Sequence, residues 1–398
     1  MTTSSRATGA DGFGIENLPY GVVSVGTDPT ARVVVRLGDA AIDLGAADIS
    51  ARAGVDAGVF TRPSLNDFLA LGPRAWNAVR SAVQELVASG GDALARATLP
   101  LEAVDVMLPI EIGDYVDFYS SIHHATNLGR ILRPDAEPLL PNWKQLPVGY
   151  HGRAGTVVVS GTPVARPAGI VDEATGPVFT LTRALDIELE VGFVVGAAGS
   201  RLAPDDADQH IFGVVLLNDW SARDIQAFEY QPLGPHLAKS FATTISPWVV
   251  TMEAIAPFLV RAPVQDPQPA EYLRATRPWA LELELRVALN GTEICATNFR
   301  DMYWTFAQQL AHMTVNGATT RPGDLYGSGT VSGPDAGERG SLIEITWRGR
   351  DPLTLDDGSE RTYLEDGDVV EITGWCGGNG RPCVGLGSCA GTIVAREG

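Results

Sequence analysis

The stretch that decides the fold reads Leu185-Asp186-Ile187-Glu188-Leu189-Glu190-Val191. Apolar and acidic residues alternate strictly along it, which is typical of a β-strand with its apolar side chains on one face. The carboxylates share the other face, and those of Glu188 and Glu190 lie roughly 6 to 7 Å apart at a strand rise of about 3.3 Å per residue. Because a cation fits between two carboxylates at that distance, this strand predicts both a sheet and a metal site.

A second strand ends on another acid. The mostly apolar run 211–218 predicts a buried strand and leaves the carboxylate of Asp219 at the edge of a core, where it needs a partner. Together with Asp117, these acids offer only hard oxygen donors, which favours Mg²⁺, Ca²⁺ or Mn²⁺ over zinc or copper.

Another acidic pair has the same spacing. Glu282 and Glu284 run toward the hairpin turn Asn290-Gly291, which is typical of an exposed ribbon. Spacing alone leaves both pairs open as candidate metal ligands.

The composition favours a small-molecule partner. The chain has 398 residues, 45% of them hydrophobic, which favours one large domain with a smaller one. A formal net charge of −19 and a pI near 4.7 repel phosphate backbones and anionic lipid, so nucleic acid and membrane surfaces are disfavoured. No apolar stretch approaches the roughly 20 residues of a membrane span, and residues 1–6 lack the apolar core of a signal peptide. We therefore expect a cytoplasmic protein, with reduced packing cysteines at Cys295, Cys376, Cys383 and Cys389.

Two domains are predicted, 1–110 and 111–398. The first reads as a small β-barrel or sheet, with a helix from Pro73 that buries apolar residues at 76, 79, 83 and 86 and stops at Gly90-Gly91. The second reads as mostly β with a few helices. Its strand-like runs span residues 156–159, 179–181, 185–195, 211–218, 248–252, 281–289, 342–347 and 369–374.

A short helix is predicted directly after the second strand. Ser221 and Asp224 have the spacing of a capping box, which opens a helix. Arg223, Gln226 and Tyr230 are then spaced by 3 and 4 and share one polar face beside the acid that ends the strand. The alternative interpretation is that this face is simply solvated.

The residues alone leave the choice of a general base open. His123 and His124 are adjacent, so either could be the base while the other is structural, and His151 is a further alternative. We interpret His210, His236 and His312 as structural. The chain lacks the G-x-S-x-G signature of a serine hydrolase, and its glycine-containing segments 234–240 and 385–391 do not match a nucleotide-binding loop.

Five longer strings carry a family resemblance, at residues 114–121 (DYVDFYSS), 124–127 (HATN), 146–153 (LPVGYHGR), 218–226 (NDWSARDIQ) and 239–248 (KSFATTISPW). They resemble the fumarylacetoacetase family in its full-length, two-domain form. The likeness extends from Asn17 to Gly391 and includes the small N-terminal domain that shorter relatives of the superfamily lack.

The resemblance implies a small N-terminal β-barrel followed by a large mixed β-sandwich roll, usually as a homodimer. It implies a metal-dependent hydrolase that cleaves the carbon–carbon bond of fumarylacetoacetate to give fumarate and acetoacetate, the last step of tyrosine and phenylalanine degradation. The expected cofactor is Mg²⁺, Ca²⁺ or both, with Mn²⁺ as an alternative.

The resemblance also implies ligands for two ions. The first ion is held by the residues that correspond to Asp117, Glu188, Glu190 and Asp219. The resemblance therefore selects the pair Glu188 and Glu190 over the pair Glu282 and Glu284. The second ion uses Asp219, the main chain of Lys239, and Thr243.

Roles in catalysis and substrate binding follow from the same resemblance. The base corresponds to His124 and is oriented by Glu344. The groups that polarise the attacked carbonyl correspond to Arg223, Gln226 and Lys239. The substrate is held by the residues that correspond to Tyr119, Arg133, Tyr150, Gln226, Tyr230 and Thr330.

Two positions depart from the family pattern. A second imidazole, His123, adjoins the implied base, and Ala238 stands where glycine is expected before the lysine, which could shift Lys239. Two other functions remain open. One is an acylpyruvate hydrolase or decarboxylase of the same superfamily, against which the full N-terminal domain argues. The other is a non-catalytic divalent-cation-binding or scaffold protein, in which His124 and Glu344 would have no role.

Overall fold

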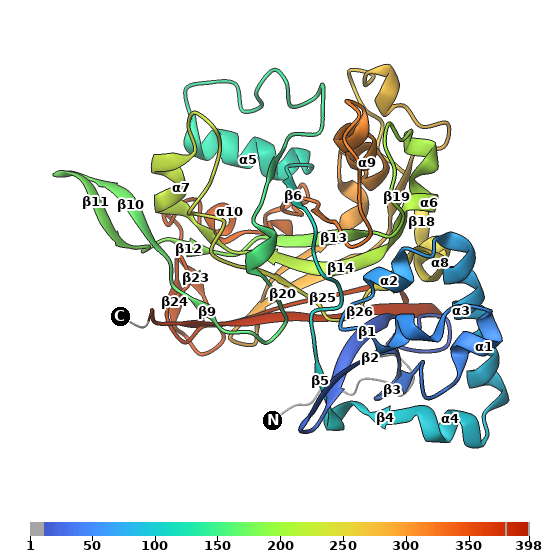
Figure 1. Ribbon diagram of the computed structural model, residues 1–398. Coiled ribbons are helices and arrows are strands. Elements are labelled where there is room, and N and C mark those ends of the chain that lie inside the picture. The colour runs from blue at the N-terminus through green and yellow to red at the C-terminus, as the bar shows by residue number, and fades with distance from the viewer. Residues whose placement is uncertain (1–11, 379, 397–398) are drawn as a thin grey trace.

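In the computed structural model, which describes residues 12–378 and 380–396, a five-stranded antiparallel sheet with the order β4-β3-β2-β1-β5 forms the N-terminal unit (Figure 1). Its elements are β1 (Tyr20–Val25), β2 (Asp28–Leu37), β3 (Ala40–Asp43), α1 (Ile49–Ala53), α2 (Asn66–Leu69), α3 (Pro73–Ser89), α4 (Asp92–Ala97), β4 (Thr98–Pro100) and β5 (Val104–Val106). The predicted helix is confirmed as α3. It begins at Pro73, where no amide hydrogen is needed, ends before Gly90, which has a φ of 62°, and buries its apolar stripe.

An eight-stranded mixed sheet forms the centre of the large unit, with the order β7-β6-β22-β13-β14-β16-β8 and with β17 paired to β14. Its strands are β6 (Tyr115–Phe118), β7 (Gly149–His151), β8 (Val157–Val159), β13 (Leu189–Val195), β14 (Ile211–Asp219), β16 (Thr243–Ile245), β17 (Val250–Thr251) and β22 (Leu325–Gly327). The pairs β6–β22 and β8–β16 are parallel, whereas β13 and β14 are antiparallel.

A second sheet, ordered β21-β20-β25-β26-β9, packs on one face of the central sheet. Its strands are β9 (Val164–Ala165), β20 (Glu284–Leu289), β21 (Thr292–Asn298), β25 (Val369–Gly378) and β26 (Arg381–Val394). The other acidic pair lies at the start of the β20–β21 hairpin, with Glu284 exposed and Glu282 half-buried, and the strand then runs to the predicted turn at Asn290-Gly291.

Strand β14 is covered on both faces. Val214 and Leu216 share a core with the second sheet, whereas Val215 and Leu217 share one with the N-terminal unit, including Phe68. A strand buried on both sides needs a nearly continuous apolar sequence, which is what this run has. The predicted mainly β fold, with a small N-terminal unit and a large β-sandwich, is confirmed.

Shorter elements surround the two sheets. Figure 1 shows α5 (Ile122–Leu132) and α7 (Arg223–Glu229) near one end of β13 and β14, and a hairpin of β10 (Ala168–Glu173) and β11 (Gly176–Leu181) that extends away from the body. The others are β12 (Leu185–Asp186), α6 (Ala207–His210), β15 (Ser221–Ala222), α8 (Met252–Ile255), β18 (Leu259–Arg261), β19 (Trp279–Leu281), α9 (Phe306–Thr314), α10 (Leu342–Ile345), β23 (Leu353–Thr354) and β24 (Glu360–Arg361). Within the described ranges, no helix is long and apolar enough to cross a membrane.

Two predicted strands are wrong in detail, for one shared reason. The run 185–191 is interrupted between β12 and β13, and residues 342–345 form the helix α10 rather than a strand. The carboxylate of Asp186 accepts hydrogen bonds from the amides of Ile187 at 2.7 Å, Leu342 at 2.7 Å and Ile343 at 3.0 Å. This carboxylate therefore ends one strand and holds the first amides of α10.

The predicted capping box before α7 is also wrong. The helix begins at Arg223, and the hydroxyl of Ser221 donates instead to the carbonyl oxygen of Asp219 at 2.9 Å. Asp224 accepts from the amide of Arg183 at 2.8 Å and from the hydroxyl of Thr182. These tertiary contacts replace the local bonds that a capping box would make.

Candidate active site

Four buried carboxylates meet at one end of the central sheet, from Asp117 on β6, Glu188 before β13, Glu190 on β13 and Asp219 at the end of β14. One oxygen from each lies within 4.8 Å of the others. Gly327 lies between two of them, because a Cβ there would come within 2.9 Å of Glu190 Oε2 and 3.3 Å of Asp117 Oδ1. Because glycine has no side chain, this position keeps the space between the carboxylates open.

Two of the four carboxylates have cationic partners. Lys239 Nζ lies 2.5 Å from Glu188 Oε2 and 2.7 Å from Asp219 Oδ2, and Arg223 Nη1 lies 2.8 Å from Glu188 Oε1. Burial alone would raise the pKa of Glu188, but the charges of Lys239 and Arg223 outweigh burial and hold it below its ordinary value. Burial alone would likewise lower the pKa of Lys239, yet Asp219 and Glu188 raise it, so the ammonium stays charged.

The other two carboxylates lack such partners. In the described part of the chain neither Asp117 nor Glu190 forms an ion pair, and Asp117 Oδ1 and Glu190 Oε1 have no hydrogen-bond partner. Burial, followed by the charge of neighbouring carboxylates, raises the pKa of both well above the ordinary value. The charges of two carboxylates without cationic partners are balanced by one divalent cation, and their unbonded oxygens can serve as its ligands. These residues therefore fit a divalent metal ion.

Asp219 is held from two further sides. The hydroxyl of Tyr150 on β7 donates to Asp219 Oδ2 at 2.8 Å, and that of Thr243 donates to Asp219 Oδ1 at 3.0 Å. Thr243 is the residue paired with Asp219 in the register of β14 and β16. The sheet therefore fixes which threonine reaches this carboxylate.

A buried histidine and glutamate form the second part of the site. His124 lies in the first turn of α5, where its amide donates to the N-cap hydroxyl of Ser121 at 3.2 Å. Its Nδ1 lies 2.6 Å from Glu344 Oε2 on α10. This bond assigns the proton of the neutral ring to Nδ1 and leaves Nε2 able to accept one.

Glu344 is held by more than the histidine. Ser332 Oγ at 2.9 Å and Ser341 Oγ at 2.7 Å also donate to Oε2, and Asn127 Nδ2 donates to Oε1 at 2.9 Å. Burial raises the pKa of Glu344, but His124 and these donors outweigh burial and lower the pKa to about 2. The carboxylate is therefore ionised at neutral pH and fixed in position.

Arg223 joins the two parts of the site. Its Nε donates to Asp186 Oδ2 at 2.7 Å, its Nη1 donates to Glu188 and to Gln226 Oε1 at 3.1 Å, and its Nη2 is buried without a partner. A buried guanidinium with an unused donor is suited to an oxygen of a bound molecule. Asp186, which fixes Arg223, also holds the amide end of α10.

Four further predicted residues lie around this centre. The Tyr119 ring lies edge-on to His124, with centroids 5.3 Å apart. Arg133 follows the end of α5, with Nη2 donating to the Pro138 carbonyl at 2.9 Å and with Nε buried and unpaired. Thr330 Oγ1 is also buried without a partner. Tyr230 is half-buried after α7, and its hydroxyl accepts a bond from Gln231 at 3.1 Å.

Sequence reasoning missed the residues that hold Arg223 and Glu344, which are Asp186, Asn127, Ser332 and Ser341. Asn127 had a signal, because it follows the histidine by three positions in a helix and must share its face. Ser341 had one too, because Ser341 and Glu344 have the S-x-x-E spacing of a capping box, whereas Ser332 had none, because its contact depends on where α10 lies. Of the other histidines, His123 is half-buried and His151 is exposed.

Comparisons with known proteins agree with this geometry. Residues 16–109 match the family model described as Fumarylacetoacetase N-terminal, and residues 115–394 match the one described as Fumarylacetoacetate (FAA) hydrolase C-terminal. The chain is 47% identical to the fumarylacetoacetase of Rattus norvegicus over 403 residues and 46% identical to that of Homo sapiens over 404, with 96% of each chain covered. It is 46% identical to that of Caenorhabditis elegans, covering 97% of both chains.

Solved structures show the same fold at low identity. A fumarylacetoacetate hydrolase from Exiguobacterium antarcticum aligns with a TM-score of 0.58 at 17% identity, covering 95% of this chain and 100% of its own. The maleylpyruvate hydrolase from Sphingobium sp. SYK-6, in complex with manganese (II) ion and pyruvate, aligns with a TM-score of 0.55 at 16% identity, covering 96% and 100%.

Proposed function

Because this chain belongs to the fumarylacetoacetase family, we propose that it hydrolyses fumarylacetoacetate to fumarate and acetoacetate, the last step of tyrosine and phenylalanine degradation. The observation that carries this function is the His124–Glu344 pair, which lies in the same buried site as four carboxylates with two free oxygens. Such a site joins a base for activating water to a place for a divalent cation.

The metal ligands that we propose are the four clustered carboxylates, with Asp117 and Glu190 supplying the uncompensated charge. A divalent cation there supplies Lewis-acid stabilisation of the negative charge that develops on the leaving acetoacetate. We propose Mg²⁺ or Ca²⁺ as the native ion, with Mn²⁺ as an alternative, which the manganese in the maleylpyruvate hydrolase supports. A second ion would use Asp219, the main chain of Lys239, and Thr243, whose hydroxyl already contacts Asp219.

His124 is the proposed general base. Its Nε2 takes a proton from the attacking water while Glu344, fixed by three other donors, stabilises the imidazolium that results. Water adds to the ketone carbonyl of the fumaryl half, which becomes the second carboxyl group of fumarate. When the carbonyl re-forms, the carbon–carbon bond breaks, and its electron pair leaves with acetoacetate, which takes up a proton.

The negative charge on the attacked oxygen needs donors. We assign this role to Arg223, which has an unused Nη2, together with Gln226 and Lys239. Loss of one such donor typically lowers turnover by about 10² to 10³. The groups that hold the substrate are Tyr119, Arg133, Tyr150, Gln226, Tyr230 and Thr330, and the unpaired Nε of Arg133 supports its assignment to the fumarate carboxylate.

The test uses protein stripped of metal by a chelator and then given Mg²⁺, Ca²⁺, Mn²⁺ or nothing. Loss of the dicarbonyl absorbance of fumarylacetoacetate is followed, with acylpyruvates in parallel. We expect metal to restore cleavage that is selective for fumarylacetoacetate. Turnover of acylpyruvates alone would assign the site to another substrate, and turnover of neither would leave a binding protein.

Two pairs of variants test the assigned residues. His124→Ala should lower turnover by about 10² to 10⁴ with metal binding intact, whereas His123→Ala, one position away, should retain turnover. Arg133→Ala should raise KM, whereas Arg130→Ala, on the exposed side of α5, should not. The base assignment fails if the two histidine variants behave alike, and the carboxylate assignment fails if KM is the same for Arg133→Ala as for the wild type.

We also propose a homodimer. The β10–β11 hairpin extends from the body (Figure 1) and exposes apolar side chains, with Phe179 66% and its cross-strand partner Ile170 37% exposed. A two-stranded ribbon with this surface is poorly stable alone and is better accommodated in an interface. Light scattering should give twice the mass of the chain, and Phe179→Glu should weaken the association. A monomeric wild type would refute this proposal.

Two organisational proposals remain. We place the domain boundary at residues 110 and 111, which the gap between the two family matches supports. We place the enzyme in the cytoplasm, where cysteines stay reduced, in keeping with the burial of Cys295, Cys376 and Cys389 in the core. Limited proteolysis and cell fractionation, respectively, test these assignments.

A further inference from the structure

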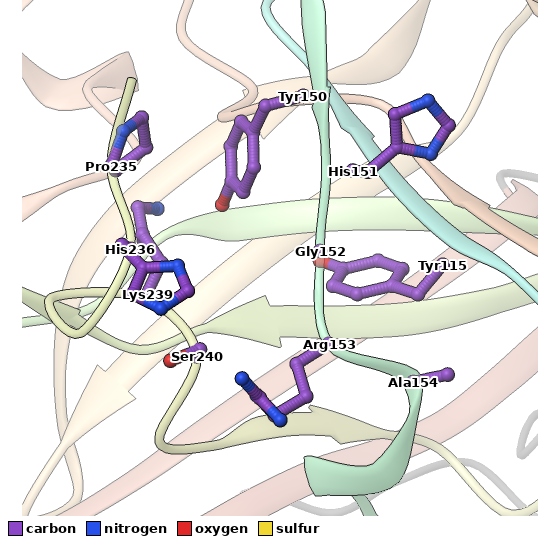
Figure 2. Close-up of a pocket in the computed structure, with 10 residues that line it drawn as sticks. All are labelled: Tyr115, Tyr150, His151, Gly152, Arg153, Ala154, Pro235, His236, Lys239 and Ser240. Carbon is purple, nitrogen blue, oxygen red and sulfur yellow. The ribbon is translucent and has the colours of Figure 1, made fainter. Parts of the chain in front are cut away.

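The two parts of the active site are held in different ways. A recess of about 290 Å³ adjoins the carboxylates, with Tyr150 and Lys239, which both contact Asp219, in its walls (Figure 2). Among the described residues, those that line this recess come from outside α5 and α10, so the base and its partner depend on other contacts. Helix α10 has only four residues, and so short a helix is not stable without tertiary packing. The position of Glu344 therefore depends on what packs against α10.

A left-handed turn directly follows α10. Trp347, Arg348 and Gly349 have φ values of 50°, 61° and 80° in succession. This region suits glycine, whereas a bulky residue such as tryptophan occupies it only where surrounding contacts hold it there. Backbone strain of this kind is concentrated at functional sites, and the turn begins three residues after Glu344. The contacts that hold Trp347 in place therefore bear on the position of Glu344.

Two guanidinium groups hold the Trp347 ring. The guanidinium carbon of Arg339 lies 5.2 Å from the ring centroid, and that of Arg350 lies 5.9 Å from it. Cations within about 6 Å of an indole ring are attracted to it. Arg339 Nη1 also donates to the main-chain carbonyl oxygen of Glu344 at 3.0 Å, which satisfies one of the carbonyls at the end of α10. One arginine therefore contacts both the ring and the residue that holds the base.

The ring also lies beside the contact between α10 and α5. It packs against a small core of Leu128 and Ile131 from α5 and Ile343 from α10. Leu128 follows His124 by four positions, so both side chains share one face of α5. That face therefore meets α10 through a polar contact at the histidine and through an apolar contact against which Trp347 packs.

Resting on the proposed function, we propose that Trp347 is a positioning residue for Glu344. The tryptophan, held by Arg339 and Arg350, fixes α10 against α5 and so keeps Glu344 Oε2 at 2.6 Å from His124 Nδ1. It acts on the reaction only through this carboxylate. The strain is retained because glycine, which would relieve it, cannot supply the ring.

Trp347→Gly tests this inference, because glycine accepts the left-handed backbone while the ring is lost. With fumarylacetoacetate, kcat should fall about 10-fold, since a misplaced catalytic group can cost up to about 10²-fold, and KM and metal content should stay unchanged. The acidic limb of kcat/KM should move to lower pH, as it should when Glu344→Gln removes the charge. Trp347→Phe keeps an aromatic ring and should recover most of the loss. Trp375→Gly, which removes a ring that Arg286 covers at 5.4 Å on β25, is the matched control and should leave kcat and the pH profile unchanged.

A double-mutant cycle separates positioning from a general structural role. If Trp347 acts through Glu344, Trp347→Gly should lower kcat in the wild type but not further in Glu344→Gln. Equal losses in the two backgrounds would overturn the inference, as would an unshifted pH profile in Trp347→Gly. Should Trp347→Gly fail to fold, Arg339→Met, which loses the guanidinium contacts with the ring and with Glu344, is put through the same cycle with the same criteria.

A measurement without substrate distinguishes this inference from the proposed function. The proton on His124 Nδ1 is followed by NMR, because its hydrogen bond to Glu344 protects it from exchange with water. It should exchange faster in Trp347→Gly than in the wild type or in Trp375→Gly, and equal rates would overturn the positioning role. If the rates differ but the wild type does not cleave fumarylacetoacetate, only the proposed function fails.

Discussion

Replacing Glu344 by glutamine removes the negative charge beside the proposed base, His124, and keeps the shape of the side chain. The pKa of Glu344 lies at about 2 rather than at its ordinary 4.5, which corresponds to about 3 kcal/mol in favour of the buried carboxylate. His124 is the largest of the causes that lower this pKa, and the same interaction stabilises the imidazolium that forms as water loses its proton. The loss of that charge should therefore lower kcat by up to about 10², since 1.36 kcal/mol is tenfold.

The assay is the initial rate of absorbance loss at saturating fumarylacetoacetate, with bound metal measured in parallel. Glu344→Gln should lower kcat, leave the metal content unchanged, and move the acidic limb of the pH profile of kcat/KM to lower pH. Glu360→Gln, an exposed glutamate, is the matched control. An unchanged kcat in Glu344→Gln would refute the assignment of Glu344 as the partner of the base.

The same variant tests the stability that this carboxylate contributes. A carboxyl group whose pKa is lowered by folding stabilises the protein above its ordinary pKa and loses that contribution as the pH falls toward the folded value. For Glu344 the window runs from 4.5 down to about 2. The difference in unfolding free energy between wild type and Glu344→Gln should therefore shrink across this window, and a constant difference would contradict the linkage.

Three further outcomes follow from named contacts. Asp186→Asn breaks a buried ion pair with Arg223, so the free energy of unfolding should fall by about 3–5 kcal/mol and kcat should fall with it, as measured by denaturant titration and initial rates. Removal of the metal should lower the temperature of thermal unfolding, since the buried carboxylates of Asp117 and Glu190 lose their counter-charge, and added Mg²⁺ or Mn²⁺ should restore it. Gly129→Ala places a Cβ 2.0 Å from the Pro138 carbonyl oxygen that accepts from Arg133, so KM should rise, whereas Gly337→Ala, with open space around it, should be neutral.

The metal ligands were accessible from the sequence because strand geometry is local. Alternation along residues 185–191 placed the two glutamates together, and the apolar run of β14 placed Asp219 at its end. The resemblance then chose this acidic pair over the one at Glu282 and Glu284, a choice that spacing could not make. The surface position of that second pair agrees with the choice.

The supporting roles of Asp186 and Ser332 could not be predicted, because their contacts depend on long-range packing. Asp186 looked like a third acid on the same strand face, yet its carboxylate turns to Arg223 and to the amides of α10. Residues 342–347 are apolar and β-branched enough to read as a strand, but Asp186 holds their first amides and the segment becomes a helix. A contact between positions more than 150 residues apart overrides the local propensity there.

The two parts of the site lie on different layers, which makes their functions separable. The carboxylates lie on or beside strands of the central sheet, which is buried on both faces. His124 and Glu344 lie on α5 and α10, outside that sheet. Variants of the base should therefore retain the metal, and variants of the metal ligands should leave the His124–Glu344 bond in place. Asp186 is the exception, because through Arg223 and α10 it touches both parts, and only its loss should disturb metal binding and the base together.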